Sequence, residues 1–274
     1  MITHLQDNVT LNNGVKMPGF GLGVYKVEDG DTVIHAVSSA LNNGYRHIDT
    51  ATIYDNEKGV GQAVKESGIP REEIFITSKV WNDDQGYEST LKAFEETLEK
   101  LDTNYLDLYL IHWPVSGKYK DTYRALEKLY EEGKVRAIGV SNFHVHHLED
   151  LMNDCTITPM VDQVEFHPHL TQNDLRKFCQ DNNIQFEAWS PLKKGRLFED
   201  PTLMEIAETH GKTVAQVMLR WDIQHGVVTI PKSIREKRII ENADIFDFAL
   251  SEEEMKRIDE MNKDERTGSN PDTF

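Results

Sequence analysis

Cysteines and long apolar runs are both scarce in this sequence. Its 274 residues include only two cysteines, Cys155 and Cys179, which form no CxxC pair. Two widely spaced thiols cannot build a disulfide framework, so we interpret them as reduced, structural residues. No stretch approaches the ~20 consecutive apolar residues of a membrane-spanning helix, and the opening residues MITHLQDNVTLNNG lack the basic and then apolar run of a signal peptide. These absences predict a cytoplasmic protein that has no membrane partner.

Positive charge is scarce as well. Lysine and arginine number 30 against 47 aspartates and glutamates, which gives a formal net charge of −17 at pH 7. Nucleic acid and anionic membranes repel such a surface, so neither is expected as a partner. One segment, IPKSIREKR at 230–238, departs from this pattern because it holds four cations and a single acid. Its cations are Lys232, Arg235, Lys237 and Arg238.

The sequence has no linker rich in proline, glycine or serine and no low-complexity segment, so residues 1–274 are expected to form a single domain. Short runs rich in β-forming residues alternate with amphipathic segments, a pattern that predicts parallel strands joined by crossover helices. The expected strands cover 20–25, 46–49, 73–80, 105–113, 135–141, 160–166, 184–190 and 226–231. Apolar residues recur at helical spacing in 32–44, 87–101 and 122–133.

Eight strand–helix units in about 250 residues are the size of a (β/α)8 TIM barrel. The alternative is a doubly wound open sheet, whose usual mark is a G-x-G-x-x-G turn after the first strand. The stretch GFGLGVY at 19–25 lacks the third glycine and is not followed directly by a helical pattern, so we interpret it as a false match. The opening NVTLNNGVKMPGF at 8–20 predicts a small β-hairpin with NNG as its turn, which could cap the lower end of the barrel.

Three titratable residues fall where predicted strands end, and a fourth lies in the loop after the first of them. Asp49 ends RHID, Lys79 ends IFITSK and His112 ends LDLYLIH, at intervals of 30 and 33 residues. In this kind of barrel the chemistry lies where strands finish and loops begin, so the three side chains should lie on adjacent strands at one rim. Tyr54 follows in the stretch RHIDTATIYDNEKGVG and could fold back over them. Taken one by one, each residue could simply solvate a loop, but their shared position favours a site.

Such a group of side chains suits proton donation to a carbonyl oxygen. A tyrosine with a pKa of about 10 is a poor acid or base at neutral pH. A neighbouring lysine ammonium favours the phenolate, an aspartate keeps that ammonium charged and in place, and a histidine can hydrogen-bond the oxygen on which charge develops. The sequence therefore predicts a general acid, with the hydride supplied by another molecule.

The chain closely resembles the aldo-keto reductase family from about residue 8 to residue 262. The motifs that carry the resemblance occur in the family's order: GYRHIDTATIYDNEKGVG, IFITSKVW, YLDLYLIHWP, IGVSNF, DQVEFHP, AWSPL and IPKSIREKRIIEN. The likeness extends to bacterial members of the glyoxal, methylglyoxal and 2,5-diketo-D-gluconate reductase type. It implies a (β/α)8 barrel that reduces carbonyls with NADPH. It also implies that Tyr54 donates the proton, Lys79 lowers the pKa of Tyr54, Asp49 anchors Lys79 and His112 orients the carbonyl.

The resemblance further implies where NADPH binds. The implied contacts are Ser141, Asn142 and Gln163 for the carboxamide, Trp189 for stacking on the nicotinamide ring, Ser190 and Leu192 for the pyrophosphate, Lys232, Ser233 and Arg238 for the 2′-phosphate, and Glu241 and Asn242 for the adenine. A dianionic phosphate favours fixed cations, which accounts for the basic segment in an acidic chain and predicts a preference for NADPH over NADH. Lys193 and Lys194 follow SPL, where many bacterial relatives have a glycine. These lysines could reach the pyrophosphate or be solvated, and solvation is favoured for Lys194.

Three aromatic residues near the predicted rim, together with His112, resemble the walls of the family's substrate pocket. They are Tyr25, Trp81 and Trp113, which could alternatively only pack the top of the barrel. The loop at 114–122 and the segment after Asn262 are both short, which suggests an open apolar mouth with few groups that select substrates. We therefore expect activity on small aldehydes, on α-dicarbonyls such as methylglyoxal and glyoxal, and on ketones. The resemblance implies a monomer, because members of the family are often monomers.

Two other functions stay open at this point. A non-catalytic nicotinamide-binding subunit that senses redox state could use the same fold, although the intact set of four titratable residues disfavours it. A metal-dependent barrel hydrolase could use the histidines of HVHH at 144–147 and HPH at 167–169. Neither group has two histidines at i and i+4 with a base between them, so no metal is expected.

Overall fold

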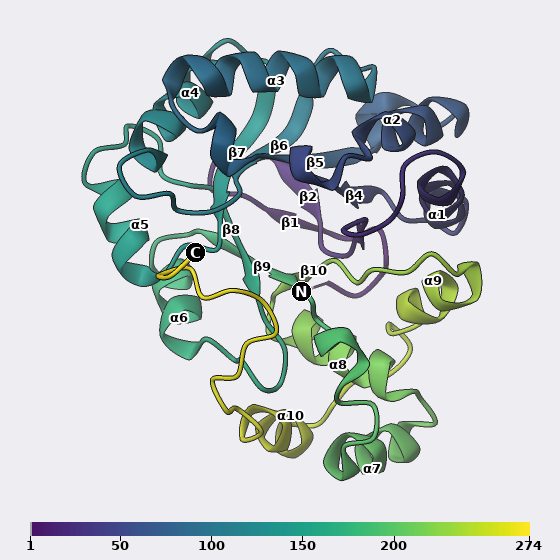
Figure 1. Ribbon diagram of the computed structural model, residues 1–274. Helices are drawn as coiled ribbons and strands as arrows, with labels where there is room; N and C mark the ends of the chain where they lie inside the picture. The colour runs from purple at the N-terminus through teal and green to yellow at the C-terminus, as the bar shows by residue number, and fades with distance from the viewer. Residues whose placement is uncertain (1) are drawn as a thin grey trace.

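Eight parallel strands form one curled sheet in the computed structural model, which describes residues 2–274 (Figure 1). Along the sheet the strands follow the order of the chain from β3 to β10. Their bounds are β3 Leu22–Gly23, β4 His47–Asp49, β5 Phe75–Val80, β6 Leu106–Ile111, β7 Val135–Ser141, β8 Val161–Glu165, β9 Gln185–Trp189 and β10 Val228–Thr229. Each of these strands lies inside one of the predicted ranges.

The two edges of the sheet meet, so the sheet closes into a barrel. Phe20, just before β3, forms a parallel bridge with Thr229 of β10. The backbone N–H of Gly23 donates to the Pro231 carbonyl at 3.3 Å. A Cβ on Gly23 would lie 2.9 Å from the carbonyl oxygen of Ile230, so a glycine is needed where the edges come this close. The predicted (β/α)8 barrel is confirmed, and the open doubly wound sheet is wrong.

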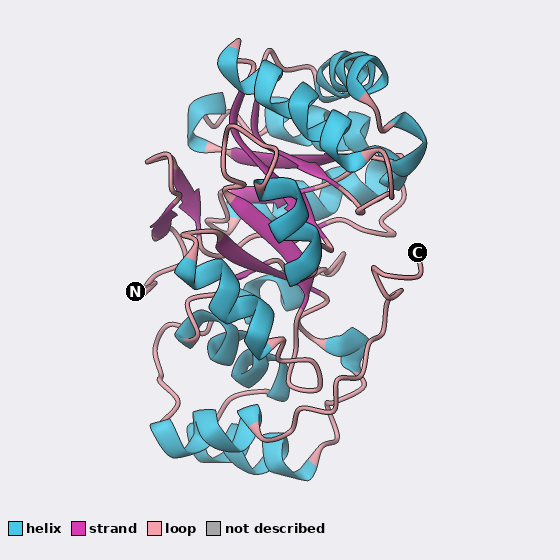
Figure 2. Ribbon diagram, turned by 90° about the vertical axis from the view of Figure 1, so that its left-hand side faces the viewer, coloured by secondary structure: helices cyan, strands magenta, loops and turns pink. Residues whose placement is uncertain are grey.

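Helices cover the outside of the barrel (Figures 1 and 2). Their bounds are α1 Asp31–Asn42, α2 Glu57–Glu66, α3 Tyr87–Leu101, α4 Tyr119–Glu131, α5 Val145–Met152, α6 Asn173–Asp181, α7 Pro201–His210, α8 Val214–Gln224, α9 Glu236–Ala243 and α10 Glu252–Asp259. Helix α3 has the predicted bounds, whereas α4 begins three residues earlier than predicted. Its first residue, Tyr119, packs edge-on against Phe143 at a ring distance of 5.4 Å. This extra turn is therefore held by a tertiary contact that helical spacing does not reveal.

A small antiparallel hairpin precedes the barrel, as predicted. Its strands are β1 Asn8–Thr10 and β2 Lys16–Pro18. The amide of Asn12 donates to the Pro159 carbonyl at 3.1 Å, and the amide of Asn13 donates to the Arg136 carbonyl at 2.9 Å. Because these carbonyls lie at the beginnings of β8 and β7, the hairpin covers the amino-terminal end of the barrel. In Figure 2 the hairpin and the carboxyl terminus lie on opposite sides of the barrel.

Alternate residues of the strands face opposite sides of the sheet, and this alternation separates polar from apolar groups. Inside the barrel His47 bonds Thr77 at 3.1 Å and Lys79 bonds Asp49 at 2.7 Å. The residue between His47 and Asp49, Ile48, belongs to the hydrophobic core. The interior is therefore polar towards the carboxyl ends of the strands, where barrel enzymes place their chemistry. Among residues 2–274, no helix has the length and apolar character that crossing a bilayer requires.

Candidate active site

Tyr54 reaches the rim through a one-turn 3₁₀ helix, Thr52–Tyr54, that follows β4. Asp55 then takes a left-handed conformation with φ 53°, which turns the chain into α2. Asn56 anchors this turn, because its side-chain amide donates to the carbonyls of Val24 and Val27, both at 2.9 Å. The chain after β3 therefore holds the loop that carries the phenol.

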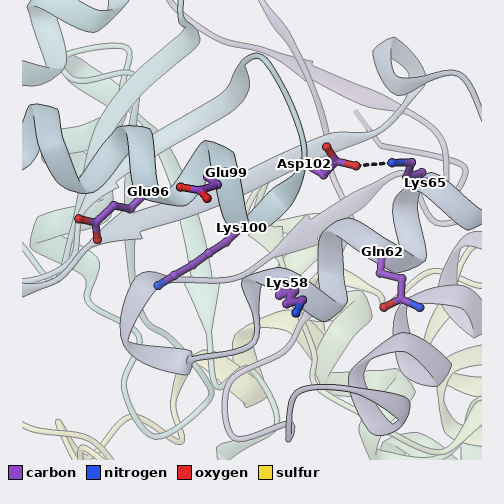
Figure 3. A pocket seen from close by; sticks show the side chains of 7 residues that line it. All are labelled: Lys58, Gln62, Lys65, Glu96, Glu99, Lys100 and Asp102. Atoms are coloured by element: carbon purple, nitrogen blue, oxygen red, sulfur yellow. Dashed lines mark hydrogen bonds and ion pairs between the residues drawn. The ribbon is translucent and has the colours of Figure 1, made fainter.

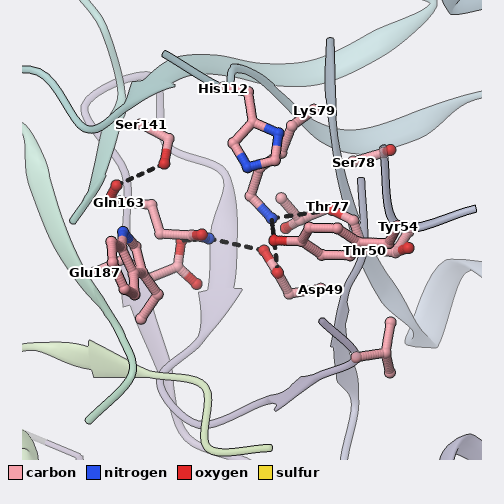
Figure 4. Close-up of polar contacts among 12 residues, drawn as sticks. Asp49, Thr50, Tyr54, Thr77, Ser78, Lys79, His112, Ser141, Gln163 and Glu187 are labelled. Carbon is pink, nitrogen blue, oxygen red and sulfur yellow. Dashed lines mark hydrogen bonds and ion pairs between the residues drawn. The ribbon is translucent and has the colours of Figure 1, made fainter. Parts of the chain in front are cut away.

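The ammonium of Lys79 lies at the centre of the site, between Asp49 and the hydroxyl of Tyr54 (Figure 4). It donates to Asp49 Oδ1 at 2.7 Å, to the Thr50 carbonyl at 3.0 Å and to Tyr54 Oη at 3.3 Å. All three of its donors have acceptors, and its side chain is fully buried. Removing one partner from a buried ion pair of this kind typically costs about 3–5 kcal/mol of stability. The neighbouring strands β4 and β5 bring Asp49 and Lys79 together, as the sequence spacing predicts.

Burial dominates the protonation of Tyr54. It raises the pKa of Tyr54 to about 12, and the nearby Lys79 ammonium opposes this effect only in part. Desolvation lowers the pKa of Lys79, but Asp49 and Tyr54 outweigh it, so the pKa of Lys79 is raised overall. Lys79 acts in the direction that the sequence analysis expects, yet the phenol keeps its proton at neutral pH. A group that holds its proton until a stronger base forms beside it is suited to donate that proton.

His112 follows β6 directly and faces the phenol. Its ring packs edge-on against Tyr54 with centroids 5.7 Å apart. Burial, and next the charge of Lys79, hold the pKa of His112 well below its usual range, so the ring is neutral. The buried Nδ1 of His112 has no hydrogen-bond partner within residues 2–274. A neutral imidazole can bind an oxygen through one N–H without itself carrying charge.

A hydrogen-bonded floor lies below Asp49. The amide of Gln163 donates to Asp49 Oδ2 at 2.7 Å and to Glu187 Oε2 at 3.0 Å. Burial, together with the charge of Asp49, raises the pKa of Glu187 to about 8. The sequence analysis did not identify Glu187. The signal that could have found it is a glutamate in the middle of the apolar strand IQFEAW.

The residues predicted to hold the carboxamide, on β7 and β8, are hydrogen-bonded to one another and to Trp189 of β9, which was predicted to stack on the nicotinamide ring. The Ser141 hydroxyl donates to the Gln163 carbonyl at 2.7 Å. The Trp189 indole N–H donates to Asn142 Oδ1 at 2.9 Å, and the Asn142 amide donates to the His112 carbonyl at 2.9 Å. These bonds orient Trp189 and Asn142 towards the same rim as His112.

The loop after β9 is strained and tied to the carboxyl-terminal segment. Ser190, Lys193 and Lys194 have left-handed backbones with φ 52°, 46° and 56°, and Leu192 between them is half-buried. Lys193 is buried rather than solvated, and it bonds His169 Nδ1 at 2.6 Å and Glu265 at 2.7 Å. Lys194 is exposed and donates to the Thr267 carbonyl at 3.0 Å. Strain of this kind is typical of loops that clamp a ligand.

The four cations of the basic segment at 230–238 are exposed and have no carboxylate partner among the described residues. Ser233 is buried and accepts the backbone N–H of Arg235 at 3.1 Å. Glu241 is half-buried and Asn242 is buried, both on α9. Unpaired cations beside the start of a helix suit an anionic phosphate.

The three predicted wall aromatics surround His112 and Tyr54. Tyr25 is exposed and packs against Tyr54 at a ring distance of 5.0 Å. Trp81 packs edge-on against His112 at 5.3 Å, and Trp113 lies parallel to His112 at 6.5 Å. All three therefore border the rim that holds the phenol.

The carboxyl-terminal segment also reaches this rim, although its shortness suggested an open mouth. The backbone N–H groups of Thr267 and Gly268 donate to the Glu165 carboxylate at 2.6 Å and 3.0 Å. The ring of Phe274 then stacks on Trp113, with centroids 4.1 Å apart and planes at 22°. The sequence carried no signal for this path, because Thr267 and Glu165 are 102 residues apart.

The histidines that suggested metal ligands do not form one site. The three of HVHH lie around Asp272, whereas His167 bonds Glu165 at 2.9 Å. Neither group contains Asp49, Tyr54, Lys79 or His112. Their arrangement therefore gives no support to a catalytic metal in the manner of a hydrolase.

A surface hollow between α2 and α3 is separate from this site (Figure 3). It contains the exposed ion pair of Lys65 and Asp102. Its lining residues are Lys58, Gln62, Lys65, Glu96, Glu99, Lys100 and Asp102. Because no predicted site residue lines this hollow, the carboxyl end of the barrel is the better candidate.

A family model described as Aldo/keto reductase family matches residues 19–263. The chain belongs to this family. This aldo/keto reductase is 67% identical over 272 residues to a protein named glyoxal reductase from Bacillus subtilis (strain 168), and the match covers 99% of each chain. It is 44% identical over 270 residues to methylglyoxal reductase DkgA from Salmonella typhimurium (strain LT2), with 97% of each chain covered.

A solved structure supports the same assignment. An aspartate-to-alanine mutant of Gox0644 in complex with NADPH superposes on this aldo/keto reductase with a TM-score of 0.94. The two are 44% identical, and the match covers 98% of each chain. At this level of identity the likeness extends beyond the fold, and membership of the family makes the chain an oxidoreductase.

Proposed function

We propose that this aldo/keto reductase reduces small aldehydes, α-dicarbonyls such as glyoxal and methylglyoxal, and ketones to alcohols, with NADPH as reductant and Tyr54 as proton donor. The observation that carries the proposal is the hydrogen bond from buried Lys79 to the hydroxyl of Tyr54, beside a neutral His112. The relatives named for glyoxal and methylglyoxal reduction support the substrate class. The aromatic rim of Tyr25, Trp81 and Trp113 provides an apolar surface on which a small carbonyl can rest.

The donor groups of the chain fit NADPH, which is also the molecule bound to the relative Gox0644. The unpaired cations of the basic segment match a 2′-phosphate, and the face of Trp189 matches a flat nicotinamide ring. When bound, the reduced nicotinamide supplies the hydride. The residues that would hold the cofactor are Ser141, Asn142, Gln163, Trp189, Ser190, Leu192, Lys232, Ser233, Arg238, Glu241 and Asn242.

The residues around Lys79 act on the carbonyl oxygen. The Tyr54 hydroxyl and one N–H of His112 would bind that oxygen and polarise it. As the carbonyl carbon gains a hydride, the electron pair of the C=O bond moves onto the oxygen, which takes the Tyr54 proton. Lys79 stabilises the phenolate that is left, and Asp49 holds Lys79 in place. A neutral His112 suits this role because it binds the oxygen without competing as an acid.

NADPH consumption measured over a panel of carbonyls tests the proposal, with Tyr54→Phe as the decisive variant. Removing the phenol should lower kcat by about 10²–10⁴-fold and leave NADPH affinity close to wild type. Tyr87→Phe, at an exposed tyrosine of α3, serves as the control and should keep full activity. Retained turnover in Tyr54→Phe would contradict the assigned role. NADPH binding without turnover of any carbonyl would favour the redox-sensing alternative, and a sugar ketone or steroid preferred a thousandfold over dicarbonyls would contradict the substrate class.

A further inference from the structure

Three histidines gather at the beginning of α5 around a carboxylate from the far end of the chain. His144 Nδ1 lies 3.1 Å from Asp272 Oδ2. His146 Nε2 lies 3.0 Å and His147 Nε2 lies 3.7 Å from Asp272 Oδ1. The four ligand atoms all lie within 4.8 Å of one another. Across residues 2–274, no other group of three or more histidine, cysteine or acidic side chains converges in this way.

We propose that these four side chains bind one zinc ion, which fastens the carboxyl-terminal segment to α5 and takes no part in catalysis. Zinc bonds to imidazole nitrogen and carboxylate oxygen are about 2.0–2.2 Å long, so tetrahedral ligands lie about 3.4 Å apart. The distances from the three histidine nitrogens to the Asp272 carboxylate oxygens run from 3.0 to 3.7 Å, which brackets the roughly 3.4 Å expected between zinc ligands. Imidazole and carboxylate ligands without thiolates also suit a divalent ion of this type. This proposal departs from the expectation that the chain has no metal site.

A histidine with an ordinary pKa of about 6.5 is mostly neutral at pH 7, and a neutral imidazole ring offers one nitrogen lone pair to a metal. His146 is 62% exposed, which gives an ion a path from solvent to the cluster.

Two hydrogen bonds compete with a cation at this place. Arg266 donates to His144 Nε2 at 2.9 Å, which leaves the proton of the neutral ring on Nδ1, facing Asp272. The backbone N–H of His144 donates to His147 Nδ1 at 3.1 Å, which leaves that ring's proton on Nε2. Coordination moves both protons to the opposite nitrogens, so Arg266 must turn away and the His147 ring must give up the hydrogen bond from the His144 backbone N–H. His146 and Asp272 bind without such a change and form the first pair of ligands.

The ion would fix the position of an aromatic residue at the rim. Asp272 lies two residues before Phe274, whose ring stacks on Trp113. A zinc ion on Asp272 therefore restrains the segment that carries Phe274 without contacting the four residues around Lys79. The binding itself does not depend on the proposed carbonyl reduction.

Calorimetric titration of the full, tag-free chain with zinc chloride tests the proposal. Wild type should bind one zinc per chain, and His146→Ala should bind at least tenfold more weakly while its circular dichroism spectrum stays unchanged. His35→Ala, at an exposed histidine of α1, is the matched control and should bind like wild type. Cobalt in place of zinc should give the strong visible absorption of a tetrahedral site. Absence of stoichiometric binding, or wild-type affinity in His146→Ala, would overturn the proposal.

Two further measurements separate this site from loose surface binding. Arg266→Gln should bind zinc more tightly than wild type, because the competing guanidinium is gone; unchanged affinity would overturn the assignment of His144 as a ligand. Zinc should also slow hydrogen exchange in residues 266–274 of wild type but not of His146→Ala. Equal exchange with and without zinc in wild type would overturn the claim that the ion fastens this segment.

Discussion

The barrel centre and the surface segment at 230–238 use positive charge in opposite ways. Lys79 is fully buried and donates to three acceptors, whereas Lys232 and Arg238 are exposed and form no ion pair with any of residues 2–274. A buried cation whose bonds are all used acts on the protonation of its neighbours and cannot bind a new anion. An exposed cation without a partner keeps its capacity for an incoming anion. The difference suits the proton chemistry proposed for the first region and the phosphate binding proposed for the second.

The largest effect is expected from Lys79→Met. Without the ammonium, the phenolate left by proton transfer loses its stabilising charge, and kcat should fall by about 10³-fold. Asp49 also becomes a buried charge without a counter-ion, so the free energy of unfolding should drop by about 3–5 kcal/mol. Steady-state kinetics and urea unfolding measure the two effects, with activity assayed where circular dichroism shows a folded chain.

Lys65→Met is the matched control for this comparison. Lys65 also pairs with an aspartate, Asp102, but both side chains are exposed (Figure 3). Exposed ion pairs contribute little to stability, so neither kcat nor the unfolding curve should change measurably. If Lys79→Met and Lys65→Met behaved alike, burial would not be what distinguishes the two lysines.

A smaller effect is expected from Arg238→Ala in the basic segment. Loss of a charge-assisted hydrogen bond of about 1.5–3 kcal/mol should raise the KM for NADPH by roughly 10–100-fold. The KM for NADH should stay the same, because NADH lacks the 2′-phosphate, and the loss with NADPH should shrink at high salt. Lys237→Ala, in the same segment but outside the proposed phosphate contacts, is the control. An equal loss with both cofactors would contradict the phosphate assignment, as would a wild-type enzyme equally efficient with NADPH and NADH.

The strands and the main site residues could be predicted from the sequence because their signals are local or periodic. Runs of β-forming residues marked all eight strands, and the repeat of the strand–helix unit placed Asp49, Lys79 and His112 on one rim. Tyr54 was predictable because it lies only five positions after Asp49, the last residue of β4. In a parallel barrel, equal spacing along the chain becomes nearness in space.

The remaining features depend on contacts that no local pattern encodes. Tyr54 was expected to have a lowered pKa, yet burial by the whole surrounding rim raises it. Lys193 was expected at the pyrophosphate or in solvent, yet it is buried against Glu265, which lies 72 residues further along the chain. Phe274 reaches the rim and Asp272 reaches α5, both through a carboxyl-terminal segment without helix or strand. Such contacts join distant residues one at a time, so periodicity gives no warning of them.

The smallest expected effect concerns Glu187, a second carboxylate beside Lys79 in the buried region. Burial raises the pKa of Glu187 from 4.5 to about 8, and the negative charge of Asp49 adds to this effect. Lys79 can balance only one of the two carboxylates, and Asp49 is already paired with it. Between these pH values the folded protein keeps a proton that the unfolded chain releases. The stability that this proton confers is complete below about pH 4.5 and is lost as the pH rises through about 8.

Glu187→Gln has no proton to lose, and its amide can still bond Gln163. The variant should match wild type in thermal stability at pH 5 and exceed it at pH 9 by at least roughly 4 °C, the shift that about 1–2 kcal/mol produces in a chain of this size. The full rise of the pKa from 4.5 to about 8 allows a larger difference. Calorimetric scans from pH 5 to pH 9 measure the difference, with exposed Glu99→Gln of α3 as control. Parallel curves for wild type and Glu187→Gln would mean that the barrel interior tolerates both carboxylates as anions. In that case burial would not limit the number of negative charges around Lys79. The buried site and the exposed basic segment would then not differ in how they handle charge.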